Sequence, residues 1–223
     1  EISSCDWSSD VCSSDLLIRV PFAQGDGALQ AISINCPSCG APVSINDREC
    51  SYCNRPILLS SFNSMDGMSA TELNKYISSY RKELNDRPSD RRLNRAAALC
   101  YMKLKMYDKA SEAFEKAIED NLDDADSYFF AAISLLKGKK AFLAKRPEVD
   151  KAIEYLSAAN MIAPKGIYAY FHAYIKYDYF ARKSSNTVPD YRELLEEAQR
   201  LGVTDYDVKV LFDLLNVVRP TDL

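Results

Sequence analysis

The sequence is poor in the residues from which most active sites are built. Its 223 residues include a single histidine, His172, and only seven glycines. We find no paired catalytic carboxylates and no nucleophile elbow, and one histidine cannot form a triad without a nucleophile beside it. Gly138 and Lys139 are not preceded by the glycine spacing of a phosphate-binding loop. These absences predict a protein that is not an enzyme and a His172 that packs as a structural residue.

Long apolar runs and an excess of one charge are also missing. A membrane-spanning helix needs roughly 18–20 apolar residues, and the run at 16–18 is broken by Arg19 and Pro21. We therefore expect a soluble protein that does not contact membranes. The formal net charge is −4, which gives no positive field to attract nucleic acid. With 47% hydrophobic and 27% charged residues, the chain has the composition of a globular protein rather than a disordered one.

Residues 1–16 differ from the rest, because they repeat Ser-Ser beside Cys or Asp without helical or strand periodicity. The segment resembles the peptide that results from translating a sequencing adapter; a natural Ser-rich leader is the alternative. Either way we expect a non-native or disordered leader, and the first reading implies that the true N-terminus lies outside this sequence. Residues 17–31 stay unassigned. Without the leader the formal net charge becomes zero.

Four cysteines stand in two pairs at metal-binding spacing. The pairs are Cys36-Pro-Ser-Cys39 and Cys50-Ser-Tyr-Cys53, and each is followed by a residue that tolerates a positive φ angle, Gly40 or Asn54. Two such turns provide a tetrahedral, closed set of thiolates, which is typical of a structural zinc site. Residues 32–59 contain too few apolar residues for a core of their own, and modules this small usually need a metal or disulfides.

The segment 32–59 resembles the zinc-ribbon modules common in bacterial proteins, which implies one structural Zn²⁺ per chain. An iron site of the rubredoxin type would use the same four thiolates, and two disulfides are a further alternative. Outside the leader only Cys100 is left unpaired, and we expect it to be a small buried residue. This cysteine pattern favours a reducing cytoplasm over a disulfide framework.

Helical periodicity begins after a Ser, Asn, Asp and Gly-containing linker at 60–68. Ser69 and Glu72 have the spacing of a capping box, and Thr204 with Asp207 repeats the pattern. We predict a helical domain over 69–219, with helices at about 70–85, 91–105, 107–120, 125–137, 149–161, 165–183, 189–201 and 205–217.

Small and aromatic residues recur on these helices in a fixed order. The best series is Ala98, Tyr101, Tyr107, Ala110, Phe114 and Ala117. It resembles the tetratricopeptide (TPR) repeat, a 34-residue pair of antiparallel helices. The resemblance covers about 70–217, is strong at 91–124, and is interrupted by extra residues at 138–147 and 183–188. It implies a mainly α solenoid of antiparallel helix pairs with a small N-terminal β zinc ribbon.

The predicted function is that of a non-catalytic, zinc-stabilised adaptor in the bacterial cytoplasm. The TPR resemblance implies that a protein partner binds in the groove of the helical repeats. Nucleic acid is not expected, because the ribbon carries only Arg48 and Arg55 as cations, opposed by Asp47 and Glu49. The alternative is a nucleic-acid-associated regulator that uses the ribbon and the basic loop at 137–146. The simpler interpretation of that loop is a solvated segment paired with nearby carboxylates.

Overall fold

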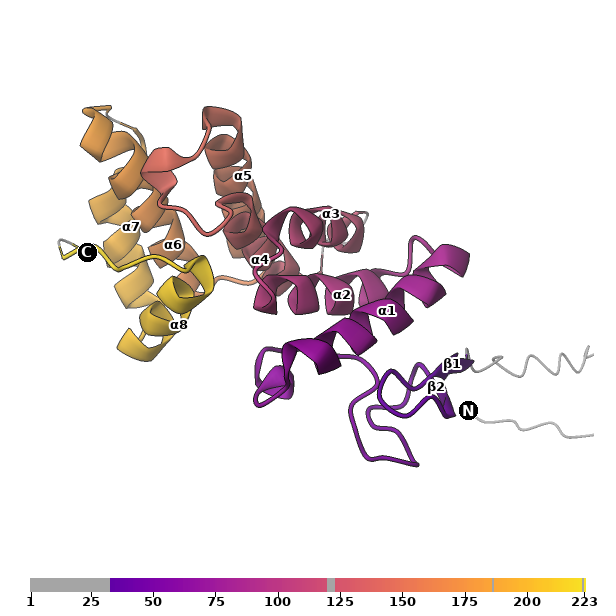
Figure 1. Cartoon of the computed structure of the whole chain (residues 1–223). Coiled ribbons are helices and arrows are strands. Elements are labelled where there is room, and N and C mark those ends of the chain that lie inside the picture. Colours follow the sequence, from indigo (N-terminus) through magenta and orange to yellow (C-terminus); the bar gives the residue numbers. More distant parts are fainter. Residues whose placement is uncertain (1–32, 120–122, 186, 222) are drawn as a thin grey trace, which may run out of the picture. The chain divides into compact units, whose positions relative to one another are not determined.

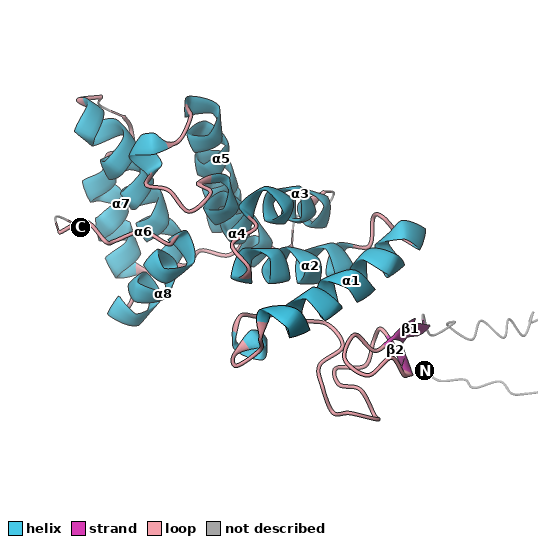
Figure 2. Cartoon of the chain, in the orientation of Figure 1, coloured by secondary structure: helices cyan, strands magenta, loops and turns pink. Residues whose placement is uncertain are grey.

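The computed structural model describes residues 33–119, 123–185, 187–221 and 223. These residues belong to one compact unit, Ile32–Leu223. The predictions for the leader and for 17–31 lie outside the described residues. A two-stranded sheet comes first and is followed by helices joined by short connections (Figures 1 and 2). The predicted fold class, a mainly α solenoid of helix pairs with a small N-terminal β element, is confirmed.

The described helices pack in consecutive antiparallel pairs. Their bounds are α1 (Ala70–Asp86), α2 (Arg91–Lys103), α3 (Tyr107–Ile118), α4 (Ala125–Leu135), α5 (Arg146–Ile162), α6 (Gly166–Ile175), α7 (Tyr191–Arg200) and α8 (Asp205–Leu215). The pairs are α2 with α3, α4 with α5 and α6 with α7, and α1 packs on α2 where the second helix of a preceding pair would lie. No described helix combines the length and the apolar composition needed to cross a membrane.

Polar side chains fix where several helices begin. At α1, the Ser69 hydroxyl accepts a hydrogen bond from the Glu72 amide (3.2 Å), and the Glu72 carboxylate accepts one from the Ser69 amide (2.9 Å). The predicted capping box is therefore present. Thr204 and Asp207 form the same reciprocal pair at α8. Each box satisfies backbone amides that have no partner inside the helix.

Small and aromatic residues fill the spaces between the helices, as the TPR resemblance implies. Ala98, Ala110 and Ala117 are buried, which lets α2 and α3 approach closely. Phe114 is fully buried and stacks on Phe130 of α4, with ring centroids 6.1 Å apart. The aromatic series thus joins one pair to the next in a continuous core. Cys100 is buried in α2, as predicted.

The helix predicted over 165–183 changes type partway along. α6 ends at Ile175 and is followed by the π-helix η3 (Lys176–Phe180) and the 3-10 helix η4 (Ala181–Lys183). In η3 the Asp178 carboxylate is 1% exposed and accepts hydrogen bonds from the Phe142 amide (2.8 Å) and from Arg182 (2.6 Å). Because the amide belongs to η2 (Ala141–Leu143) in the 138–147 insertion, the periodicity of 165–183 alone could not reveal the change.

The last helix, α8, packs back over two earlier pairs. It contacts α6 and α4, which are the first helices of their pairs. The ring of Phe212 lies edge-on to Tyr174 and Tyr170 of α6, with centroids 5.2 and 6.4 Å apart. Beyond the helix, Asn216 accepts a hydrogen bond from Lys105, just after α2. The chain therefore covers part of its own row of first helices.

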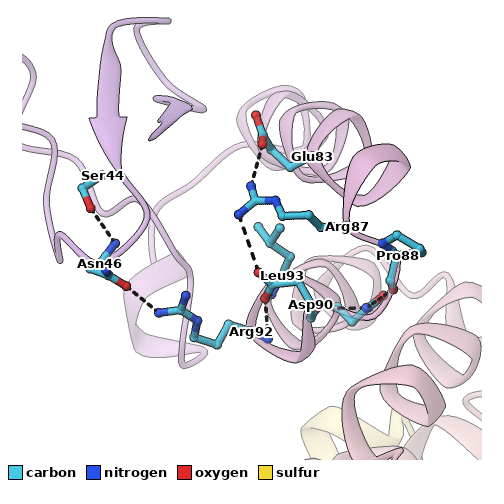
Figure 3. Close-up of polar contacts among 9 residues, drawn as sticks. Ser44, Asn46, Glu83, Arg87, Pro88, Asp90, Arg92 and Leu93 are labelled. Atoms are coloured by element: carbon cyan, nitrogen blue, oxygen red, sulfur yellow. Dashed lines mark hydrogen bonds and ion pairs between the residues drawn. The ribbon is translucent and has the colours of Figure 1, made fainter. Parts of the chain in front are cut away.

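The N-terminal sheet and the helices share one core. The Tyr80 hydroxyl of α1 donates a hydrogen bond to the Ile57 carbonyl (2.9 Å) and accepts one from the Leu59 amide (3.1 Å). At the edge of this contact, Arg92 donates to the Asn46 side chain (2.9 Å), whose backbone amide donates to the Ser44 hydroxyl (3.2 Å) (Figure 3). These contacts hold the ribbon segment on α1 and α2.

The segment predicted as a linker, 60–68, also packs on the helices. It contains the 3-10 helix η1 (Asn63–Met65), and Met65 is fully buried. The Phe62 ring lies edge-on to Phe130 of α4, with centroids 5.3 Å apart. Residues from the predicted ribbon, linker and helical domain therefore contribute to one compact unit, and the domain limits at 59 and 69 stay a prediction about sequence segments.

Candidate metal centre

The two Cys-x-x-Cys segments form two matching turns. In the first, the Gly40 amide donates a hydrogen bond to the Cys36 carbonyl (2.9 Å); in the second, the Asn54 amide donates to the Cys50 carbonyl (2.8 Å). Gly40 and Asn54 have φ angles of +81° and +55°, the left-handed conformation that glycine and asparagine tolerate best. The turn chemistry predicted from the sequence is confirmed.

Each turn is carried by paired extended backbone. The strands β1 (Ser33–Asn35) and β2 (Pro42–Ser44) are antiparallel and flank the first turn, with Ile34 opposite Val43. An isolated bridge between Glu49 and Pro56 closes the second. The buried apolar residues beneath the turns are Ile34, Val43, Ile45 and Ile57. These residues belong to the same core as Tyr76 and Tyr80 of α1, so the two turns rest on the helices.

The four sulfur atoms converge on one point. Cys36 Sγ lies 3.7 Å from Cys53 Sγ, and Cys39 Sγ lies 3.7 Å from Cys50 Sγ; all four lie within 4.8 Å of one another. A tetrahedral ion with thiolates at about 2.3 Å places its sulfurs about 3.8 Å apart, whereas a disulfide bond is about 2.05 Å long. The cysteines are free thiols, and they are positioned to bind a metal ion.

The local electrostatics favour a bound cation. Burial raises the pKa of Cys50, but hydrogen bonds from the Tyr52 and Cys53 amides and from the neighbouring thiols lower it to about 7. The Ala41 amide lowers the pKa of Cys39, but burial and the other three thiols raise it to about 12. The neighbouring thiols therefore favour the thiolate of Cys50 and oppose that of Cys39. A divalent cation would offset this repulsion, because metal binding and thiol deprotonation are coupled.

The ribbon cation Arg55 pairs with Glu72 of α1 at 2.7 Å, so its charge is engaged within the chain. In the basic loop, Lys137 pairs with Glu148 (3.4 Å) and Arg146 with Asp150 (2.7 Å), as the simpler interpretation predicted. The loop is not wholly solvated, however, because Ala141 is fully buried and the Phe142 amide is bonded to Asp178. No local pattern in the sequence indicated that this loop contacts η3.

His172 packs as a structural residue of α6, as predicted. It is half-buried, and its Nε2 atom is buried without a hydrogen-bond partner among the described residues. Burial, together with the positive charge of Lys176, lowers its pKa to about 4. No described nucleophile is bonded to it, and it takes no part in the four-cysteine site.

Because the pKa of His172 is lowered, we expect the protein to be less stable in mild acid. Because this pKa is about 6.5 in the unfolded chain and about 4 in the folded one, the unfolded state binds the extra proton between these values. The contribution of neutral His172 to the free energy of unfolding is therefore fully present above about pH 6.5, and it is lost as the pH drops toward 4. For a half-buried group we expect a loss of about 2 kcal/mol, measured by urea unfolding at both ends of this range. His172→Leu should lose clearly less; an equal loss would contradict the assignment.

The fold and the site together define a helical-repeat protein with a small N-terminal segment that carries four cysteines positioned to bind a metal ion. The solved structure titled "MamA MSR-1 C2" is similar to this chain at 18% sequence identity, with a TM-score of 0.47, over 62% of this chain and 71% of that one. Neither a protein family nor a curated protein matches the sequence.

Proposed function

We propose that the four-cysteine site binds one structural zinc ion per chain through Cys36, Cys39, Cys50 and Cys53. The sulfur separations of 3.7 Å support this, because they are close to the edge of a zinc–thiolate tetrahedron. Four protein ligands leave no position open for water or substrate, so the ion would have a structural role. A reducing cytoplasm would keep the thiols available for it.

We further propose that the protein is a non-catalytic adaptor that binds a protein partner through the helical repeats. Part of the row of first helices is covered, because α8 packs on α4 and α6. An open groove of about 360 Å³ remains between α8, the end of α2 and the segment around η1. Its apolar lining residues are Phe62, Met102, Tyr107, Tyr206, Val210 and Leu214.

This groove is the observation that carries the adaptor proposal. Tyr206 at its border is 73% exposed, and aromatic residues and methionine are enriched where proteins bind one another. Charged side chains of both signs also line the groove, among them Asp66, Lys103 and Asp213. An apolar centre with a polar border is the usual anatomy of a protein interface.

Site-specific photo-crosslinking tests the proposal. A photoreactive amino acid at Tyr206 of the full chain should give discrete protein adducts in extract of the cells that make the protein, and nuclease should not remove them. The same amino acid at Arg192 of α7, which is similarly exposed, is the matched control. Val210→Glu should reduce the adducts at Tyr206 by filling the groove. Equal adducts at both positions would contradict the adaptor function, and nuclease-sensitive adducts would favour the nucleic-acid alternative.

A further inference from the structure

Two segments far apart in the sequence form one exposed surface around Phe142. The first is the insertion with η2, and the second is η3 with η4. The Phe142 amide donates to Asp178 of η3 (2.8 Å), and the Ala141 amide donates to the Tyr174 hydroxyl (3.4 Å). Because Ala141 and Asp178 are buried, the first bond fixes η2 against η3 and the second fixes η2 against the end of α6. A π-helix often marks a functional position in a helix.

Positive side chains gather over the aromatic rings of this surface. Arg182 and Lys183 each lie 4.9 Å from the centre of the Phe142 ring. Lys183 also lies 3.5 Å from the centre of Tyr179. On Phe180, Arg146 and Lys176 lie 5.0 and 5.3 Å from the ring centre. Such contacts hold cations in place without neutralising them. We name this set, together with Lys139, Lys140, Leu143 and Lys145, the basic-aromatic surface.

The charge of the basic-aromatic surface is not balanced by its own acids. Segments 137–150 and 176–183 contain eight basic and three acidic residues. Asp178 is buried and bonded to Arg182, and Asp150 is paired with Arg146. No described carboxylate lies within 4.0 Å of the ammonium groups of Lys139, Lys140, Lys145, Lys176 or Lys183. Lys176 is only 8% exposed, so it supports Phe180 from below. The cations open to a partner are the exposed ones, Lys139, Lys140, Lys145, Arg182 and Lys183.

We propose that the basic-aromatic surface binds an acidic segment of a partner protein, with Asp and Glu residues placed around an apolar side chain. The cations would pair with the carboxylates, and the apolar side chain would pack on Leu143 and Phe142, which are 66% and 36% exposed. This site goes beyond the proposed groove, because its lining residues are different ones and it would act even if the groove bound nothing.

An acidic protein segment fits this surface better than a nucleic acid does. Single strands are bound by stacking bases on free ring faces, whereas cations lie over the rings of Phe142, Tyr179 and Phe180. The formal net charge is −4 for the whole chain and zero without residues 1–16, so in either case the long-range attraction that drives nucleic-acid binding is missing. A local cluster of cations on a neutral or acidic chain instead selects a local cluster of carboxylates.

Fluorescence anisotropy with two probes tests the inference. One probe is a short labelled peptide of Asp and Glu around a central Leu, and the other is a labelled single-stranded oligothymidylate. We expect the full, metal-loaded chain to bind the peptide more tightly than the oligonucleotide. The double variant Lys140→Glu, Lys183→Glu should weaken peptide binding about tenfold or more. The control Lys109→Glu, Lys116→Glu makes the same charge change on exposed positions of α3 and should weaken it far less.

Three results would overturn the inference: no binding of the peptide, equal weakening by both double variants, or tighter binding of the oligonucleotide. Thermal unfolding of each double variant shows whether it is folded. Crosslinking from Tyr206 in the Lys140→Glu, Lys183→Glu background should be unchanged, because that groove has different lining residues. Failure of the basic-aromatic surface is therefore distinguishable from failure of the proposed adaptor groove.

Discussion

Removal of the metal is expected to unfold residues 33–59 and to leave most of the helical circular dichroism signal in place. Either a strong chelator or Cys50→Ser should have this effect, because Cys50 is fully buried and the two turns would lose the cation that holds their thiolates together. Structural zinc contributes about 10–16 kcal/mol to the folding of modules of this kind at neutral pH. Elemental mass spectrometry should find one zinc per chain in the wild type and none in Cys50→Ser.

The helical signal should nevertheless decrease slightly, because α1 would lose the ribbon segment that covers Tyr76 and Tyr80. Cys100→Ser is the matched control, because Cys100 is also a fully buried cysteine but lies in α2, outside the four-sulfur cluster. The Cys100→Ser protein should therefore still bind one zinc ion. A wild-type chain without metal would refute the zinc proposal. Iron in place of zinc would show that the four cysteines bind a metal ion but that the ion is not zinc. Complete loss of helix together with the metal would show that the helices depend on the ribbon throughout.

Tyr80→Phe is expected to destabilise the protein by about 4 kcal/mol. The change removes one hydroxyl that donates a hydrogen bond to the Ile57 carbonyl and accepts one from the Leu59 amide. Each buried backbone group left without its partner costs about 1–3 kcal/mol. Because the rest of the ring remains, the apolar contacts of Tyr80 should persist and the loss should report the hydrogen bonds. Urea unfolding at neutral pH measures it as a shift of the midpoint with an unchanged slope.

Tyr76→Phe is the graded control, since its hydroxyl makes one hydrogen bond, to the Pro56 carbonyl (2.8 Å). It should cost about 1–2 kcal/mol. Tyr128→Phe, on α4 and distant in sequence from the ribbon, should change the midpoint little. If Tyr80→Phe and Tyr128→Phe had equal effects, the ribbon would not be held on α1 by the bonds described.

Much of the metal centre could be predicted from the sequence, because its determinants are local. Each Cys-x-x-Cys pair is a single tight turn, and Gly40 and Asn54 mark the positive φ angle that each turn needs. The spacing could not show that the four sulfurs meet, since that depends on how the two turns face each other. The electrostatics of Cys39 and Cys50 likewise arise from thiols brought close only in the folded state.

The helices were also predictable, because their determinants are local. The residues at which they begin and end were harder to predict. The expected start of α1 at Ala70 is correct because Ser69 and Glu72 form a local capping box. The helix expected to begin at 149 instead begins at Arg146, where Pro147 occupies the first turn, a position that proline tolerates. α6 ends at Ile175, and the π-helix that follows it contains Asp178, whose partner, the Phe142 amide, lies in a distant insertion.

The sequence by itself determined the helical class, the paired cysteines, the caps and the small and aromatic pattern of the repeats, because each of these is set by residues within a few positions of one another. Only the tertiary structure decided which distant segments contact each other. The ribbon packs on α1 through Tyr80, α8 packs across α4 and α6, and the loop at 137–146 contacts η3. These contacts join residues tens of positions apart, and their free energy depends on burial and hydrogen-bond geometry that no local pattern encodes.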